Sequence, residues 1–205
     1  MGKGEQTKAD IIQKAAVLFN QKGYDGAAIS DVMEATGLEK GGIYRHFESK
    51  QELALEAFEY AVRLANARYL AAIRHSHNAL DRLRAIVLTF AELQNEVPIK
   101  GGCPVMNTAI DSDDAHPALR ERAQDALEAW QAILTQVIER GIERGQISGR
   151  VDARATATRL IALMEGGLMM SRLTDDERHM AAALDGLNAW IDGLAVRSTE
   201  QPASP

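Results

Sequence analysis

Residues 39–50 read EKGGIYRHFESK, and this stretch decides how the first part of the chain folds. The residues around it follow helical periodicity, yet two adjacent glycines, Gly41 and Gly42, lie where a helix should begin. A glycine inside a helix costs roughly 0.8–1 kcal/mol relative to alanine. The pair therefore indicates a role that compensates for this cost.

Three short helices fit the first part of the chain. Residues 7–22 place apolar side chains at positions i, i+3, i+4 and i+7, which is typical of an amphipathic helix. A second helix fits Ser30–Thr36, with Ser30 as its cap, and Gly37 ends it. A third helix begins near Lys40, directly after a tight Gly-Leu turn.

Two helices joined by such a turn predict a helix-turn-helix unit. This unit places its last helix in the major groove of DNA, with the N-terminal residues of that helix next to bases and backbone. We expect Ile43 and Phe47 to form the core of the unit. Because Gly41 and Gly42 have no Cβ atoms, the first turn can come close to DNA and its free amides can face a phosphate.

Residues 23–53, GYDGAAISDVMEATGLEKGGIYRHFESKQEL, resemble the DNA-binding domain of the TetR family of one-component bacterial repressors. The resemblance rests on the pattern Lys, Gly, any, hydrophobic, Tyr, any, any, Phe, any, Ser, Lys. It implies a dimer that binds palindromic DNA, with a helical remainder for ligand binding and dimerisation. The chain departs from the family pattern at Ala27, Ala28 and Glu39, where threonine or serine is common.

The resemblance also assigns DNA-contacting roles by position. Two lysines resemble phosphate-binding residues, and Gly41 resembles the backbone that approaches DNA, whereas Gly42 replaces a residue that is often threonine or serine. A tyrosine resembles a contact to a phosphate or a base edge, and the Arg-His pair occupies the positions that set sequence preference. In chain order the expected contacts are Lys40, Gly41, Gly42, Tyr44, Arg45, His46 and Lys50.

Helical periodicity continues through the rest of the chain without strand-like alternation. A capping box opens a long helix: the Ser49 hydroxyl can accept from the Glu52 amide, while the Glu52 carboxylate accepts from the Ser49 amide. The sequence thus predicts an all-α fold, an N-terminal three-helix helix-turn-helix domain followed by a larger C-terminal helical bundle. Further helices are expected at 79–96, 104–111, 117–144, 153–173 and 175–195.

Composition and charge narrow the class of protein. The 205 residues are 46% hydrophobic and carry a net charge of −6, which argues against a protein that coats nucleic acid indiscriminately. No apolar run reaches the roughly 18–20 residues of a membrane span, and no signal peptide is recognisable, so we expect a cytoplasmic protein. The expected domains are 1–48 for DNA binding, 49–197 for ligand binding and dimerisation, and 198–205 as a disordered tail.

The last two expected helices carry more apolar residues than one helix face needs. Leucine and methionine surround Gly166 and Gly167, which allow helices to approach closely. We interpret them as a two-fold four-helix dimer interface, since a protein that reads a palindrome needs two copies. The alternative is an ordinary core. The candidate interface residues are Leu160, Met164, Leu168, Leu187, Trp190 and Ile191.

The single cysteine, Cys103, precedes Pro104, a residue that suits the first position of a helix. At the N-cap, helix dipoles favour a thiolate, and Lys100 could add to this effect. Cys103 is therefore a candidate sensor of oxidants or electrophiles. The alternative is a small buried residue, the commonest state of a free cysteine.

A short acidic cluster lies just before the helix expected at Pro117. Its composition could suggest a metal, but Asp114 or His116 more simply caps that helix while the others are solvated. We expect no metal. The cluster consists of Asp111, Asp113, Asp114 and His116.

The sequence predicts a homodimeric, ligand-responsive transcriptional regulator. Its simplest form is a repressor that a small apolar or aromatic effector, or modification of a cysteine, releases from palindromic double-stranded DNA. No Gly-rich phosphate loop, nucleophile elbow or His-Glu metal motif is present, so we expect neither enzyme activity nor a cofactor. The alternatives are an activator and a helical adaptor whose helix-turn-helix binds protein.

Overall fold

The computed structural model describes residues 2–74, 76–93, 100–112 and 115–196. These residues are helical, as predicted, and their only strand-like pairing is an isolated bridge between Ile147 and Ala195. Among the described helices, none combines the length and hydrophobicity of a membrane span. The expected tail, 198–205, lies outside the described residues.

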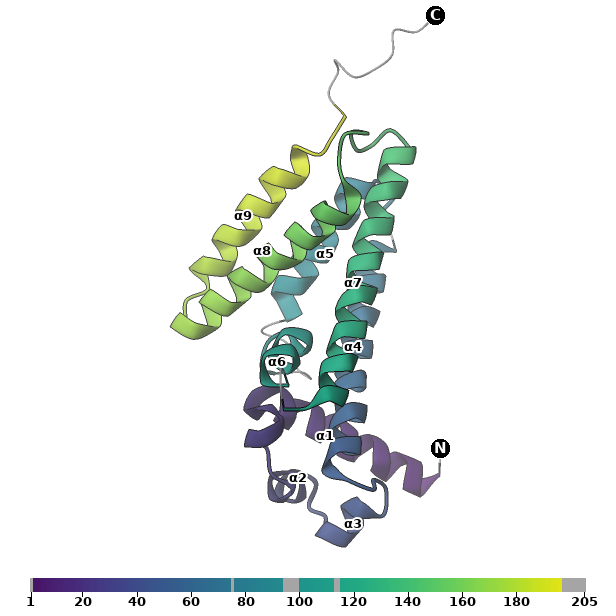
Figure 1. Cartoon of the computed structure of the whole chain (residues 1–205), viewed down its shortest axis with the longest axis vertical. Coiled ribbons are helices and arrows are strands. Elements are labelled where there is room, and N and C mark those ends of the chain that lie inside the picture. The colour runs from purple at the N-terminus through teal and green to yellow at the C-terminus, as the bar shows by residue number, and fades with distance from the viewer. Residues whose placement is uncertain (1, 75, 94–99, 113–114, 197–205) are drawn as a thin grey trace, which may run out of the picture. The chain divides into compact units, whose positions relative to one another are not determined.

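The helices group into two compact units (Figure 1). The first unit contains Met1–Asn66 and Leu93–Leu127, and the second contains Ala67–Glu92 and Glu128–Pro205. Two long helices contribute residues to both units. The units are therefore groups of packed helices and do not coincide with the functional domains expected from the sequence.

Three helices open the first unit: α1 (Lys3–Gly26), α2 (Ile29–Thr36) and α3 (Lys40–Tyr44). α1 begins earlier than the predicted helix 7–22 and contains a kink at Gly23, where φ is +74°. The predicted helix ends at this kink, because a left-handed φ suits glycine and interrupts regular helix. α3 is short, so packing of its inner side, rather than its own hydrogen bonds, holds it in place.

Side chains from α1, α2, α3 and α4 (Lys50–Ile73) form one apolar core. Ile43 on α3 and Phe47 just after it, the predicted core residues of the helix-turn-helix unit, are 0% and 2% exposed. Full burial of such a side chain contributes about 1.5–3 kcal/mol. The core orients the short α3 firmly. Its buried members are Ile11, Ala15, Ala16, Val32, Ile43, Phe47, Leu53 and Ala57.

The start of α2 differs from the prediction. The helix begins at Ile29, and Ser30 does not cap it. Instead the carboxylate of Asp31 accepts the amide of Ala28 at 2.7 Å and the ammonium of Lys22 at 2.9 Å. The hydrogen bond from Lys22, together with that from Ala28, holds the pKa of Asp31 below its usual range. An aspartate in the first turn thus replaces the missing serine cap.

The turns around α3 follow the sequence more closely. Gly37 adopts a φ of +71° and ends α2 by donating its amide to the Met33 carbonyl at 2.8 Å. The Ser49 hydroxyl accepts the Glu52 amide at 3.1 Å, as predicted. The second half of the capping box is wrong, because the Glu52 carboxylate accepts the amide of Glu48 instead of that of Ser49.

Two further elements complete the first unit: α6 (Pro104–Asp111) and the beginning of α7 (Pro117–Glu143). α6 has the predicted bounds, and α7 ends within one residue of its prediction. α6 packs against α1, so elements separated by about eighty residues lie side by side. This contact places the α6–α7 corner next to the helix-turn-helix core.

The second unit contains α5 (Ala79–Leu93), the rest of α7, α8 (Ala153–Thr174) and α9 (Arg178–Asp192). α8 and α9 pack against each other (Figure 1). A Cβ atom at Gly167 would lie 2.6 Å from the Cβ of Ala183, so glycine permits this close packing. α9 is shorter than the predicted 175–195 because Asp175, with φ at 51°, ends α8 in a left-handed turn. The predicted extension of α5 to residue 96 lies outside the described residues.

Candidate nucleic-acid interface and sensor sites

The first turn of α3 presents bare backbone to its surroundings. Gly41 is exposed, its φ is not positive, and a Cβ atom there would meet no atom within 4 Å. A Cβ atom at Gly42 would instead lie 3.5 Å from the Cβ of Leu38, in ordinary contact with the protein. Neither glycine is required by folding. Of the two, only Gly41 leaves its backbone open to the solvent, without a side chain above it; we call this opening the gap at Gly41. Close approach of DNA needs this geometry.

Basic and aromatic side chains surround this turn. Tyr44 is 37% exposed, and the Nζ atom of Lys40 lies 5.9 Å from its ring centroid. Arg45 is exposed, whereas His46 is half-buried with its ring 6.5 Å from that of Phe47. The structure therefore places Lys40, Tyr44 and Arg45 at the surface, while His46 lies against the core.

The seventh expected contact, Lys50, lies at the start of α4 and has a different environment. Its Nζ atom lies 4.3 Å from the ring centroid of Tyr24. Burial, followed by the neighbouring carboxylate of Asp25, raises the pKa of Tyr24, so its phenol stays neutral near pH 7. No pattern in the sequence indicated this contact between Lys50 and Tyr24.

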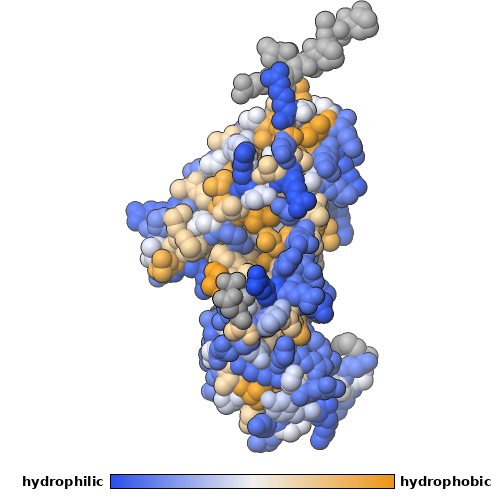
Figure 2. Space-filling model, viewed as in Figure 1, coloured by the Kyte–Doolittle hydropathy of each residue, from blue (hydrophilic) through white to orange (hydrophobic). Residues whose placement is uncertain are grey.

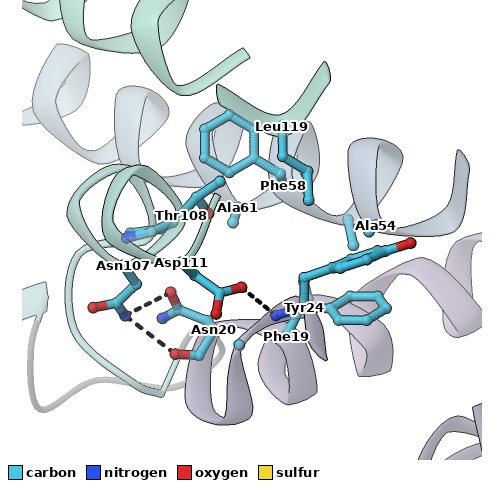
Figure 3. A pocket seen from close by; sticks show the side chains of 14 residues that line it. Phe19, Asn20, Tyr24, Ala54, Phe58, Ala61, Asn107, Thr108, Asp111 and Leu119 are labelled. Atoms are coloured by element: carbon cyan, nitrogen blue, oxygen red, sulfur yellow. Dashed lines mark hydrogen bonds between the residues drawn. The ribbon is translucent and has the colours of Figure 1, made fainter. Parts of the chain in front are cut away.

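A small pocket lies in the first unit between α1, α4, α6 and α7 (Figure 3). Apolar side chains such as Phe58 and Leu119 face amide and carboxylate groups across it. Its volume of about 30 Å³ has room for a water molecule or two. Ligand pockets typically measure roughly 300–1,000 Å³, so this pocket is too small for a drug-sized effector.

Amide hydrogen bonds fasten the loop before α6 to α1 at this pocket. The buried Asn20 donates from Nδ2 to the carbonyls of Lys100 at 3.1 Å and Gly102 at 3.0 Å. Asn107 donates from Nδ2 to the Asn20 carbonyl at 3.1 Å and to the Gly101 carbonyl at 2.8 Å. A Cβ atom at Gly101 would lie 2.6 Å from the Asn20 carbonyl oxygen, so glycine is needed there. No local sequence pattern indicates this contact.

The acidic cluster of the sequence binds protein groups in the structure. Asp111 accepts the Tyr24 amide at 2.6 Å, and the Nε2 atom of His116 lies 3.0 Å from Asp25. Of the two residues expected to cap α7, His116 thus directs its imidazole to α1, and Asp114 lies outside the described residues, so the cap stays a prediction. Asp113 also lies outside the described residues. Within the described ranges, no three potential ligands gather as a metal site would require.

Cys103 occupies the predicted N-cap of α6, with Pro104 at the first helical position. Its side chain is half-buried and makes no capping hydrogen bond. The sensing role stays a prediction.

The second unit holds an aromatic stack. The Trp130 ring lies 6.1 Å from that of Tyr69 and 5.7 Å from that of Phe90, with interplanar angles of 13° and 19°. Trp130 is 7% exposed, and within the described part of the chain its Nε1 hydrogen has no acceptor. An unsatisfied buried donor costs about 1–3 kcal/mol.

Most of the residues predicted to face a second copy are buried within the single chain. Leu160, Met164, Leu187 and Ile191 are fully buried, and Leu168 is 1% exposed. They form the core that joins α8 to α9, which was the alternative to an interface. The prediction that these five residues face a partner is therefore wrong. The remaining candidate, Trp190, is half-buried.

A different face of α8 is apolar and exposed. It carries large hydrophobic side chains at positions three, four and seven residues apart, so they share one side of the helix. Hydrophobic surface is visible over the α8–α9 region (Figure 2). The exposed members are Leu163 at 48%, Met169 at 50%, Met170 at 41% and Leu173 at 81%.

The buried core, the exposed turn of α3 and the helical remainder define a helix-turn-helix regulator, and comparisons with known proteins identify its family. The family model described as "Bacterial regulatory proteins, tetR family" matches residues 11–57. A second model, "Tetracyclin repressor-like, C-terminal domain", matches residues 79–187. The chain belongs to the TetR family and is a DNA-binding transcriptional regulator.

Individual relatives agree with this membership. The solved structure of a TetR regulator from Chloroflexus aurantiacus is 42% identical, has a TM-score of 0.91 and covers 95% of this chain and 98% of that one. The transcriptional regulator TtgR of Pseudomonas putida is 23% identical over 192 residues, which are 92% of this chain and 89% of TtgR. CifR, solved with 26-bp operator DNA, shares the fold at 17% identity and a TM-score of 0.80, covering 88% and 94%.

Proposed function

We propose that this regulator is a repressor that binds a palindromic operator as a homodimer and leaves it when a small molecule binds. The observation that carries the proposal is the first turn of α3, where the gap at Gly41 lies beside exposed Lys40, Tyr44 and Arg45. Phosphate contacts position such a protein, and base contacts specify its site. An activator would use the same contacts, and expression from a reporter promoter distinguishes the two.

The exposed groups divide naturally between these two tasks. Lys40 and Lys50 supply positive charge for phosphates, and the Gly41 backbone supplies an amide. Tyr44 reaches a phosphate or base edge, and Arg45, being exposed, is the strongest candidate for reading a base. Gly42 and His46 have less direct roles, because the missing side chain of Gly42 would face the protein and His46 is half-buried.

The substitution Tyr44→Ala tests the contact face. We expect operator affinity to fall about tenfold at matched salt, because each of two protomers loses a hydrogen bond worth roughly 0.5–1.5 kcal/mol. The dimer and the thermal unfolding temperature should not change, since Tyr44 lies outside the buried core. Fluorescence anisotropy with labelled operator measures the affinity. An unchanged affinity would show that this face does not touch DNA.

For the dimer we propose the exposed apolar face of α8 as the interface. Its large side chains flank Gly166, where a Cβ atom would meet nothing within 4 Å, so a partner helix could approach closely. A second copy related by a two-fold axis would bury Leu163, Met169, Met170 and Leu173 against the same residues. The core residues beneath this face would hold α8 and α9 in the required arrangement.

We further propose the division of labour expected from the sequence. Residues 1–48 would read DNA, and residues 49–197 would bind the effector and form the dimer. Its known relatives are regulators, so we propose that this chain acts in the cytoplasm by binding alone, without catalysing a reaction and without a cofactor or metal.

The aromatic stack suggests the chemistry of the effector. Tyr69, Phe90 and Trp130 offer an apolar, polarisable environment, and the Trp130 N–H offers one hydrogen bond. An effector that fits both features has an aromatic or apolar body and an acceptor such as a carbonyl or phenolate oxygen. This refines the apolar or aromatic effector expected from the sequence.

Trp130 fluorescence tests this effector chemistry. In a Trp190→Phe variant, binding of an aromatic carbonyl compound should shift or quench the emission of Trp130. Trp130→Phe should bind the same compound about tenfold more weakly, since it lacks the donor. Trp190→Phe provides the matched control, because it removes the other tryptophan. If Trp130→Phe bound the compound as tightly as the wild type, the effector would bind elsewhere.

Cys103 offers a second route to release, and we propose it as the alternative trigger. It caps α6, and the carbonyls of the preceding Gly101 and Gly102 are bound by the amides of α1 and α6. A bulky group on the thiol would disturb this loop and, through it, the attachment of α6 to α1.

A further inference from the structure

Tyr24 receives contacts from several segments of the first unit, beyond its place at the end of α1. Its ring lies 4.3 Å from the ring of His116, which precedes α7, and 6.1 Å from that of Phe19. Its amide donates to Asp111 at the end of α6. Its ring face holds the ammonium of Lys50, the first residue of α4. Figure 3 shows Tyr24, Phe19 and Asp111 together at the pocket.

We propose that Tyr24 is a positioning residue for DNA binding: it holds Lys50 ready for a phosphate, and the α6–α7 corner holds Tyr24. The proposal rests on the DNA contact proposed for Lys50. It adds a residue, Tyr24, that lies outside the recognition helix α3 and sets the strength of this contact. Through Tyr24, the α6–α7 corner is linked to the DNA-binding Lys50.

The chemistry of the contact between Lys50 and Tyr24 supports a positioning role for Tyr24. Lys8 and Lys22 each form an ion pair with a carboxylate, at 2.8 and 2.9 Å. Lys50 forms no such ion pair within the described residues; its ammonium lies over a ring face, and its charge acts on the carboxylate of Asp31 without a direct ion pair. A ring attracts the ammonium through its quadrupole and accepts no conventional hydrogen bond. Lys50 is thus held in place while its charge and N–H donors remain available to a phosphate.

The position of Tyr24 depends on α6 through Gly23. The φ of +74° at Gly23 turns the chain so that the Tyr24 amide points at Asp111. A Cβ atom at Gly23 would lie 2.7 Å from Oδ1 of Asp111, so the carboxylate packs directly on this glycine. A displacement of the α6–α7 corner would therefore move Tyr24 and change where Lys50 points.

Three variants test the proposal on an operator selected from random duplex DNA. Lys50→Ala should weaken binding and lower the slope of log affinity against log salt by about 0.9 for each phosphate that is no longer neutralised. Tyr24→Leu should weaken binding roughly tenfold for two protomers, because each protomer then lacks the cation–π interaction. Tyr24→Phe keeps the ring and should bind like the wild type. In a Lys50→Ala background, Tyr24→Leu should have no further effect.

A fluorinated series keeps the test independent of folding. Phenylalanine analogues with increasing fluorination at position 24 keep the shape of the ring but remove its negative face. Operator affinity should fall steadily along the series. The positioning role alone would be overturned if Tyr24→Leu lowered operator affinity equally in the presence and absence of Lys50. It would also be overturned if operator affinity did not change along the fluorination series. An unchanged salt slope in Lys50→Ala would instead overturn the DNA contact on which it rests.

Discussion

The Met169→Glu variant is expected to be a monomer that binds the operator at least about a hundredfold more weakly than the wild type. Met169 is 50% exposed on the apolar face of α8. In a two-fold interface the substitution places two carboxylates close together in an apolar setting, and an uncompensated buried charge costs roughly 3–5 kcal/mol. A monomer reaches only one half of a palindrome, so the loss of the dimer becomes a loss of DNA binding.

Leu88→Glu is the matched control, because Leu88 is 53% exposed and lies on α5 of the same unit. It should leave both the dimer and operator binding unchanged. Light scattering gives the mass of each variant, and anisotropy gives its affinity. If Met169→Glu remained a dimer, the exposed face of α8 would not be the interface.

Gly41→Ala is expected to fold at least as stably as the wild type and yet to bind the operator roughly ten- to thirtyfold more weakly. Alanine favours helix over glycine by up to about 1 kcal/mol, and the new methyl group would meet no atom of the protein within 4 Å. The same methyl group would stand between the backbone and a DNA phosphate. Loss of one amide hydrogen bond in each protomer accounts for the size of the effect.

Gly42→Ala separates this explanation from a general effect of helix propensity. The substitution offers a similar gain in propensity, but its methyl group would face Leu38 inside the protein. It should keep operator affinity close to that of the wild type. Equal losses of affinity in the two variants, or none in Gly41→Ala, would contradict close approach at Gly41.

The helix-turn-helix could be predicted because its signals are local. The apolar spacing of Ile43 and Phe47, the helix-ending Gly37 and the Ser49 cap are each readable within a few residues, and all three signals appear in the structure. The capping box was half wrong for a similarly local reason. The Glu52 carboxylate can reach either of two neighbouring amides, and its choice of Glu48 depends on the exact path of the turn.

Which face of α8 is buried within the chain could not be predicted from periodicity alone. α8 is apolar on two faces, and the pattern does not reveal which face α9 covers. Leu160, Met164 and Leu168 are the covered set. Only the packing at Gly167 shows this, because α9 approaches that side of the helix.

The junction between α1 and α6 was beyond sequence reasoning for a different reason. Asn20 and Tyr24 meet Asn107 and Asp111 across 87 residues of chain. Each of these residues has an ordinary local explanation as a polar surface or turn residue. Only the fold brings them together, and so the contact of Tyr24 with Lys50 was also missed.

Selection of bound sequences from random duplex DNA tests the central claim most directly, because it assumes nothing about where the operator lies. The account predicts one enriched palindrome with half-sites about 34–36 Å apart, one turn of B-DNA. It also predicts that Tyr44→Ala and Gly41→Ala lose affinity for that sequence while remaining dimers. Failure to enrich any sequence, or enrichment of a site that both variants bind as tightly as the wild type, would contradict operator recognition through α3.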